Sequence, residues 1–320
     1  MEVFTDFWPS LLTTFGIFLA VGFLAQLVDG AVGMAYGVIS TSVLLAFGVP
    51  PAQASATIHA AECFTTGASG ASHMLHKNVD WRLFFRLAPA GVVGGAIGAY
   101  VLTGFDPTFI KTIVIAYLGA LGVWMFVRAL RGPRDEEPHL NHVVPLGVVG
   151  GFLDASGGGG WGPIVTSTLL GRGHAPRYVI GSVNSAEFVV TLAISITFLW
   201  TLLTGRFELE GGVAQGGAAL GGLILGGVVA APLAGFVTKI APGRLLLGGA
   251  AVLVVALSVW QGVQLWPRIS EYTIDGELTV AEAVKLLRQM IGERPLVWLG
   301  SALITGGVAV ILWVNRRRFW

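Results

Sequence analysis

One segment of this chain occurs twice, and the duplication constrains the fold more than any other feature. Residues 29–66 and 154–191 align without a gap at an offset of 125 positions. Each copy opens with an aspartate, Asp29 or Asp154, in a glycine-rich run, and the identities fall on Asp, Glu, Gly, Ser and Thr as well as on Leu and Ile. Two unrelated apolar helices would share only the latter kind. The chain is therefore predicted to contain two related halves.

Composition places both halves in a membrane. Hydrophobic residues make up 54% of the 320 positions and charged residues 12%, and the mean hydropathy is +0.76. Apolar runs of about 20 residues recur along the chain, which is typical of transmembrane helices. The single cysteine, Cys63, cannot form an internal disulfide, and no nucleotide-binding or metal-ligand spacing is present. We expect no cofactor, no bound metal and no nucleic-acid partner, and the bilayer itself as a partner.

Two apolar stretches, 11–46 and 143–171, are interrupted by glycine-rich runs. The second is too long for one span of about 20 residues and too short for two, and Ser156–Gly160 at its middle is a very poor helix former. We predict that each stretch is a re-entrant hairpin of two half-helices. With this arrangement thirteen of the 19 Lys and Arg residues lie on one face and six on the other, as the positive-inside rule requires.

The predicted fold is thus an all-α integral membrane protein with an inverted repeat. Each half has one re-entrant helical hairpin plus three transmembrane helices, an odd number of crossings, so the second half is inverted. The expected parts are a first repeat at 1–130, a cytoplasmic connector at 131–142, a second repeat at 143–266, an extracytoplasmic loop with an amphipathic helix at 267–294, and one extra C-terminal transmembrane helix at 295–320. The N-terminus is predicted outside and the C-terminus in the cytoplasm. Such paired broken helices indicate a secondary transporter with a site at the midplane.

The helix breaks are also the expected binding site. Unpaired backbone N–H groups at the start of a half-helix carry partial positive charge and bind anions without Lys or Arg. Glycines there let a ligand approach the backbone. The predicted substrate-binding residues are Gly33, Met34, Tyr36, Gly37, Thr41, Gly158, Gly159, Gly160, Trp161, Gly162, Thr166 and Asn184.

Paired acidic residues supply the remaining candidates. Asp29 and Asp154 precede the glycines, where a carboxylate can accept hydrogen bonds from loop N–H groups and hold the hairpin turn. Glu62 and Glu187 lie at membrane depth, where a carboxylate is costly and is commonly paired, protonated or functional. With His59 one turn away, they are candidates for proton coupling. An alternative role for each glutamate is a fixed hydrogen bond to loop backbone.

The sequences LVDGAVGMAYGVISTSVLLAFGVPPAQASATIHAAE, from Leu27, and FLDASGGGGWGPIVTSTLL, from Phe152, resemble the sulfite exporter TauE/SafE permease family. The similarity extends over roughly residues 10–266. It implies a permease in the bacterial plasma membrane that exports sulfite, an organosulfonate or a related small anion. The outward direction is implied by this resemblance alone.

Other functions are compatible with the same residues. Asp29, Asp154, Glu62 and Glu187 could bind a metal or another cation, Na⁺ could replace the proton as coupling ion, and a backbone site would also accept small carboxylates. An enzyme is not expected. The protease-like string at Gly67–Gly70 has its serine on the same helix as both nearby histidines, whereas a nucleophile and its base must face each other. The sequence leaves the oligomeric state open.

Overall fold

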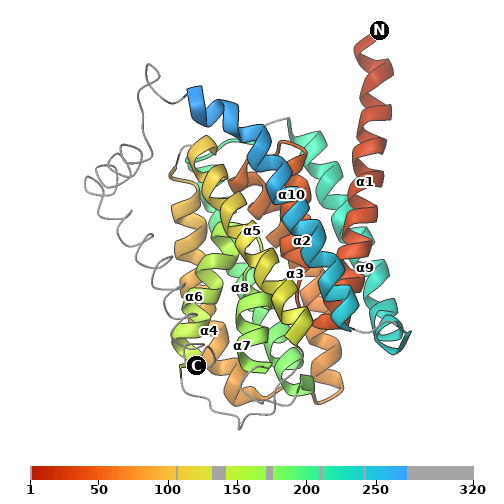
Figure 1. Cartoon of the computed structure of the whole chain (residues 1–320), viewed down its shortest axis with the longest axis vertical. Coiled ribbons are helices and arrows are strands. Elements are labelled where there is room, and N and C mark those ends of the chain that lie inside the picture. Colours follow the sequence, from red (N-terminus) through yellow and green to blue (C-terminus); the bar gives the residue numbers. More distant parts are fainter. Residues whose placement is uncertain are drawn as a thin grey trace, which may run out of the picture. The chain divides into compact units, whose positions relative to one another are not determined.

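The computed structural model contains helices and turns and no strand over the residues that it describes, which are 2–105, 107–131, 142–170, 176–209, 212–240 and 243–271. This confirms the all-α prediction. The elements are α1 (Glu2–Val32), α2 (Tyr36–Ala46), α3 (Pro51–Leu75), α4 (Trp81–Leu102), α5 (Pro107–Arg131), α6 (Val143–Gly157), the π-helical turn η1 (Trp161–Thr166), α7 (Ser167–Leu170), α8 (Pro176–Leu203), α9 (Gly212–Ile240) and α10 (Gly243–Glu271) (Figure 1).

Three predicted parts of the chain fall largely outside the described residues. They are the connector at 131–142, the extracytoplasmic segment at 267–294 and the C-terminal helix at 295–320. These assignments stay predictions.

Six of the described helices are long and apolar enough to cross a membrane. The candidate spans are Pro9–Gly30, Trp81–Leu102, Ile110–Arg131, Arg177–Leu203, Ala214–Leu233 and Arg244–Leu265. The 25-residue α3 is absent from this group because it carries His59, Glu62 and several hydroxyl side chains. By contrast α1, predicted as one arm of a hairpin, has 31 residues, whereas its counterpart α6 has 15. The re-entrant arrangement and the inversion stay predictions.

The helix pairings repeat between the two halves. Sequence equivalence relates α1 to α6, α3 to α8 and α4 to α9. In the structure α1 packs along α9, and α6 packs along α4 in the same way. The contact of α4 with α8 likewise has its counterpart in the contact of α9 with α3, while α3 and α8 pack against each other. Each half therefore completes its packing on the other half, as a pseudo-twofold relation requires.

Small residues make these paired contacts possible. A Cβ added to Gly94 of α4 would overlap the backbone of Val148 in α6, and one added to Gly222 of α9 would lie 2.5 Å from the Phe15 carbonyl oxygen in α1. In each helix a second glycine four residues later, Gly98 or Gly226, makes the next close contact. This spacing allows backbones to approach closely, which is how apolar helices associate in lipid.

The helices break where the glycine-rich runs predict. In the first half α1 ends at Val32, Gly33 has a φ of 74° and Ala35 a φ of 125°, and α2 begins at Tyr36. In the second half α6 ends at Gly157, Gly158 has a φ of 64°, and η1 begins at Trp161. Left-handed φ values favour glycine because it lacks a Cβ, so Ala35 holds an unusual conformation for its type.

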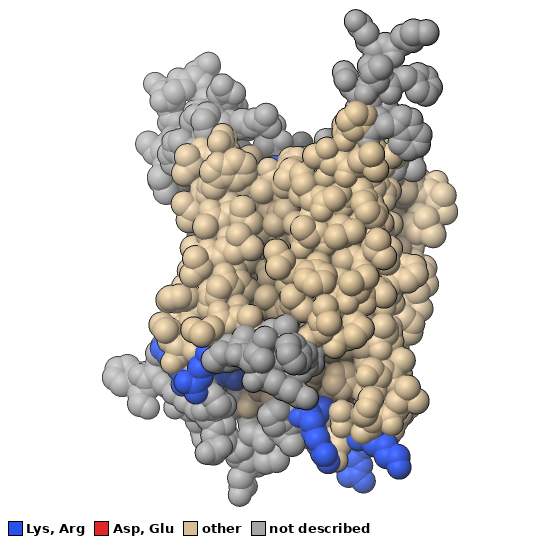
Figure 2. All heavy atoms as spheres, turned by 90° about the vertical axis from the view of Figure 1, so that its right-hand side faces the viewer, with Lys and Arg blue, Asp and Glu red and all other residues tan. Residues whose placement is uncertain are grey.

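Positively charged side chains lie mainly at one end of the face shown in Figure 2, and the broad middle band of described residues on that face is uncharged. An uncharged band with Lys and Arg at its border is typical of a membrane protein.

Candidate functional site at the two helix breaks

The two breaks meet each other in the structure. A Cβ added to Gly37 would lie 2.9 Å from the Gly158 carbonyl oxygen and 2.9 Å from the Gly159 Cα. A Cβ added to Gly159 would overlap the backbone of Val38. The two broken segments therefore cross with backbone against backbone. The crossing is so close that only glycine fits at these positions.

A second contact continues the crossing. A Cβ at Gly162 would lie 2.8 Å from the Met34 Cα, and the Ser167 hydroxyl lies 3.2 Å from the Met34 sulfur. Gly33 faces the Ile180 side chain, 3.2 Å from the position that a Cβ would take. Met34 and Gly162, both predicted to bind substrate, thus hold the two broken segments together, and Gly33 packs against α8.

Asp154 organises the second break. Its Oδ1 atom accepts hydrogen bonds from the N–H groups of Gly160, at 2.7 Å, and Trp161, at 2.9 Å. Its Oδ2 atom lies 3.2 Å from Nε2 of His59 in the first half. Asp154 is 2% exposed and His59 0%, so this contact between the halves is shielded from solvent.

Both ring nitrogens of His59 have polar neighbours. The Ser55 hydroxyl donates to the Ala155 carbonyl at 2.6 Å. His59 Nδ1 lies 2.7 Å from the Ser55 carbonyl oxygen, which can only accept a hydrogen bond. Nε2 then faces the Asp154 carboxylate, and two acceptors cannot form a stable contact without a hydrogen between them. A hydrogen on Nε2 or on the carboxyl group would make this contact favourable.

Glu62 completes a buried cluster with this pair. One ligand atom from each of His59, Glu62 and Asp154 lies within 4.8 Å of the other two, and Glu62 is 4% exposed. Its Oε1 atom would be 3.0 Å from a Cβ at Gly37, so the carboxyl group faces the crossing of the breaks. By composition and spacing, an imidazole and two carboxylates can hold either a proton or a metal ion.

The other two carboxylates lie near the same cluster. Asp29 Oδ1 accepts one hydrogen bond, at 3.3 Å, from the Tyr36 N–H, and the residue is partly exposed. Glu187 is also partly exposed and interacts electrostatically with Asp29 and Asp154. Glu62 interacts with both aspartates and with Glu187. The crossing thus concentrates four acidic groups in one region of the protein interior.

The two aromatic residues predicted to bind substrate also anchor the broken segments to neighbouring helices. The Tyr36 hydroxyl donates to the Leu223 carbonyl at 3.1 Å, and the Trp161 indole N–H donates to the Val183 carbonyl at 3.2 Å. Trp161 is 0% exposed. Both side chains occupy equivalent positions, and both are held by carbonyl groups of long helices.

The two equivalent threonines differ. The Thr41 hydroxyl donates to the Gly158 carbonyl across the crossing. The Thr166 hydroxyl is fully buried and has no hydrogen-bond partner among the described residues. A buried polar group without a partner is rare and calls for an explanation, such as a bound ligand or ion.

Asn184, which occupies the position equivalent to His59, lies apart from this cluster. Its Nδ2 atom donates to the Ser69 hydroxyl at 2.9 Å, and this bond joins α8 to α3. The first break thus lacks the histidine contact that the second break has.

Two residues of the site were not predicted from the sequence. Ser55 connects His59 to Ala155, and Tyr117 of α5 places its hydroxyl 3.5 Å from the Gly159 carbonyl. Ser55 lies one helical turn before His59, a spacing that could have indicated it. Tyr117 lies outside the duplicated segment, and nothing in its local sequence identifies it.

Comparison with known proteins gives the family of the chain. The model of the family described as "Sulfite exporter TauE/SafE" matches residues 18–266. This chain belongs to the TauE/SafE family. The family match covers both helix breaks and confirms the resemblance found in the sequence.

One curated relative is similar over nearly its whole length. The "Probable membrane transporter protein YtnM" of Bacillus subtilis (strain 168) is 38% identical over 295 residues, which are 88% of this chain and 95% of the relative. No solved structure matches the chain significantly. The family and the relative show that this TauE/SafE protein is a multi-pass membrane transporter and not an enzyme, as the sequence predicted.

Proposed function

We propose that this transporter exports a small sulfur-containing oxyanion, sulfite or an organosulfonate, across a bacterial plasma membrane, and that transport is coupled to protons. The observation that carries this proposal is the buried contact of His59 with Asp154 at the crossing of the breaks. The short contact of His59 Nδ1 with the Ser55 carbonyl supports a hydrogen between Nε2 and Asp154. The contact of His59 with Asp154 joins the two halves whose relative movement would carry a substrate.

A physical link between proton and anion follows from Asp154. Its carboxylate occupies the backbone N–H groups of Gly160 and Trp161, the donors that an anion would use. Protonation would remove the negative charge and weaken these two hydrogen bonds. The same N–H groups, together with the buried Thr166 hydroxyl, could then bind an oxyanion. Protonation and anion binding would therefore favour each other.

The outward direction comes from the family's name and agrees with membrane electrostatics. The inside-negative potential drives a net negative charge outward by about 2.3 kcal/mol per elementary charge at 100 mV. A carrier that moves fewer protons than anionic charges would therefore export its substrate down the potential.

A cation-coupled carrier is the second candidate, favoured by one observation. His59, Glu62 and Asp154 each offer a ligand atom within 4.8 Å of the others, and Na⁺ or a divalent metal could replace the proton there. Small carboxylates could likewise replace the sulfur oxyanion, because N–H donors accept either.

Thermal unfolding of the purified full-length protein distinguishes these candidates. The protein would be heated with sulfite, methanesulfonate, acetate, Na⁺ or Zn²⁺, each at pH 6 and pH 8. We expect sulfite or methanesulfonate to raise the midpoint temperature, and to do so more strongly at pH 6, because the cluster must be protonated. Stabilisation by Na⁺ or Zn²⁺ without any effect of an oxyanion would contradict the proposal.

A further inference from the structure

A cavity of about 400 Å³ lies between α1, the end of α2, the turn that joins α2 to α3, and the first turns of α3 and α9. Its lining includes Phe18, Leu44, Phe47, Gln53, Thr57 and Gln215. We name it the vestibule. None of the residues that line it belongs to the predicted site or to the cluster of His59, Glu62 and Asp154.

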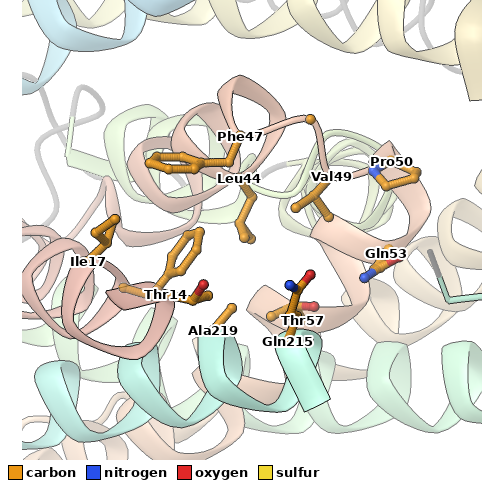
Figure 3. Close-up of a pocket in the computed structure, with 13 residues that line it drawn as sticks. Thr14, Ile17, Leu44, Phe47, Val49, Pro50, Gln53, Thr57, Gln215 and Ala219 are labelled. Carbon is orange, nitrogen blue, oxygen red and sulfur yellow. The ribbon is translucent and has the colours of Figure 1, made fainter. Parts of the chain in front are cut away.

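The vestibule has an apolar side and a polar side. In Figure 3, Leu44, Phe47 and Val49 lie along one side, and Gln53, Thr57 and Gln215 lie along the opposite side. The apolar side is extended by Phe18, whose ring centroid lies 5.6 Å from that of Phe47. A cavity with this division suits a ligand that carries both an apolar substituent and a polar head.

The vestibule is close to the crossing along two helices. Thr57 precedes Glu62 by five positions on α3, which is a rise of about 7 Å. Leu44 follows Thr41 by three positions on α2, about one helical turn. A ligand whose head lies at the crossing could therefore extend an organic group of a few carbon atoms toward the vestibule.

Among the described residues of the second half, the position that corresponds to Thr57 is closely packed. Ser182, the counterpart of Thr57, accepts a hydrogen bond from the Asp80 N–H at 2.7 Å. The adjacent Gly181 packs so closely on Asn78 that an added Cβ would overlap the Asn78 backbone. The turn between α3 and α4 thus packs against Ser182 and Gly181, whereas Thr57 lines a cavity.

We infer that the vestibule binds the organic substituent of the oxyanion substrate, and this inference rests on the proposed function. The cavity volume lies within the range of about 300 to 1,000 Å³ found for sites of organic ligands, whereas sulfite has four heavy atoms. The amide and hydroxyl groups that line the vestibule would form hydrogen bonds with polar parts of the substituent. Phe18, Leu44 and Phe47 would contact its carbon atoms. The vestibule then favours longer sulfonates over sulfite.

Two neighbouring glycines of α9 provide the test. Gly216 lines the vestibule, and a Cβ there would meet only the Gln53 amide nitrogen, at 3.8 Å. Gly217 does not line it, and a Cβ there would have nothing within 4 Å among the described residues. Gly216→Phe should therefore fill the cavity, and Gly217→Phe is the matched control, because both substitutions add the same side chain to the same exposed helix end.

The experiment measures dissociation constants of sulfite, methanesulfonate and butanesulfonate by calorimetry with purified full-length protein. We expect affinity to rise by roughly fourfold for each added methylene that is buried. The ratio of butanesulfonate to sulfite affinity should fall by roughly tenfold or more in Gly216→Phe and stay unchanged in Gly217→Phe. If Gly216→Phe does not fold, the test is how affinity depends on the length of the sulfonate's alkyl chain in the natural protein and in Gly216→Ala.

Three results would overturn the inference, and only one of them would also overturn the proposed function. If sulfite binds and sulfonate affinity does not depend on alkyl chain length, the vestibule does not bind the organic group, but the proposed function stands. If affinity depends on alkyl chain length equally in Gly216→Phe and Gly217→Phe, the organic group binds elsewhere. Failure of every sulfur oxyanion to bind the natural protein would overturn the proposed function together with this inference.

Discussion

The two helix breaks have the same ancestry in sequence and different surroundings in the structure. At the second break Asp154 is buried, accepts two backbone hydrogen bonds and contacts His59. At the first break Asp29 is partly exposed and accepts one longer hydrogen bond. Asn184 replaces the histidine there and turns to Ser69 instead. The second break is therefore more firmly held.

Duplication therefore accounts for the symmetric framework, and substitutions at single positions account for the asymmetry. The helix pairings repeat between the halves, but His59 and Asn184, or Thr41 and Thr166, do not behave alike. A carrier with one firmly held break and one looser break has a natural place for movement. We expect the looser first break to move more than the second.

The largest expected effect separates the two aspartates. Asp154→Asn should reduce transport by roughly a hundredfold or more, because it removes one partner of a buried pair. Asp29→Asn should reduce transport less than about tenfold, because it affects one hydrogen bond of 3.3 Å. Flux into proteoliposomes with equal amounts of each variant measures the effect. Equal losses would show that the two breaks are functionally alike.

The next effect concerns backbone packing at the crossing. Gly159→Ala should reduce transport by roughly tenfold or more, since its Cβ would overlap the backbone of Val38 and separate the two breaks. Gly16→Ala in α1 is the control, because a Cβ at Gly16 has nothing within 4 Å among the described residues. The same flux assay applies. Normal transport by Gly159→Ala would argue against a site at this crossing.

A third prediction concerns pH. Transport by the natural protein should fall as pH rises, because the proposed protonation that releases Asp154 from the N–H groups of Gly160 and Trp161 becomes rarer. His59→Gln removes the imidazole that contacts Asp154 and should flatten this dependence. Asn184→Ala, at the equivalent place in the other half, should keep it. A pH profile of His59→Gln identical to that of the natural protein would exclude His59 from coupling.

The smallest expected effect has opposite signs in the two halves. Thr166→Val should raise the free energy of unfolding by about 1 kcal/mol, because it removes a buried hydroxyl without a partner, and should weaken oxyanion binding severalfold. Thr41→Val should lower the free energy of unfolding by about 1 kcal/mol, because it removes the bond to Gly158. Thermal unfolding with and without sulfite measures both. If the free energy of unfolding changed in the same direction in both variants, the two threonines would not differ as proposed.

Much of the framework could be predicted from sequence because duplicated segments and hydropathy are local features. The glycine runs identified both helix breaks, and the position of Asp154 before its glycines suggested its hydrogen bonds to loop N–H groups. The family was also recognisable from the residues around Asp29 and Asp154.

Contacts between the halves could not be predicted in this way. His59 and Asp154 are 95 positions apart, and nothing local indicates that the histidine contacts that aspartate. The sequence also did not indicate that Tyr36 and Trp161, both predicted to bind substrate, donate to carbonyl groups of neighbouring helices. The vestibule depends on how α1, α3 and α9 pack, which no single segment encodes.

Proton movement coupled to sulfite flux can be measured in proteoliposomes. A pH-sensitive dye inside the vesicles would report protons while a sulfite gradient drives transport through the natural protein or through Asp154→Asn. We expect sulfite movement to change the internal pH in vesicles with the natural protein, and Asp154→Asn to remove this change. Sulfite flux through the natural protein without any proton movement would contradict the proposed proton coupling.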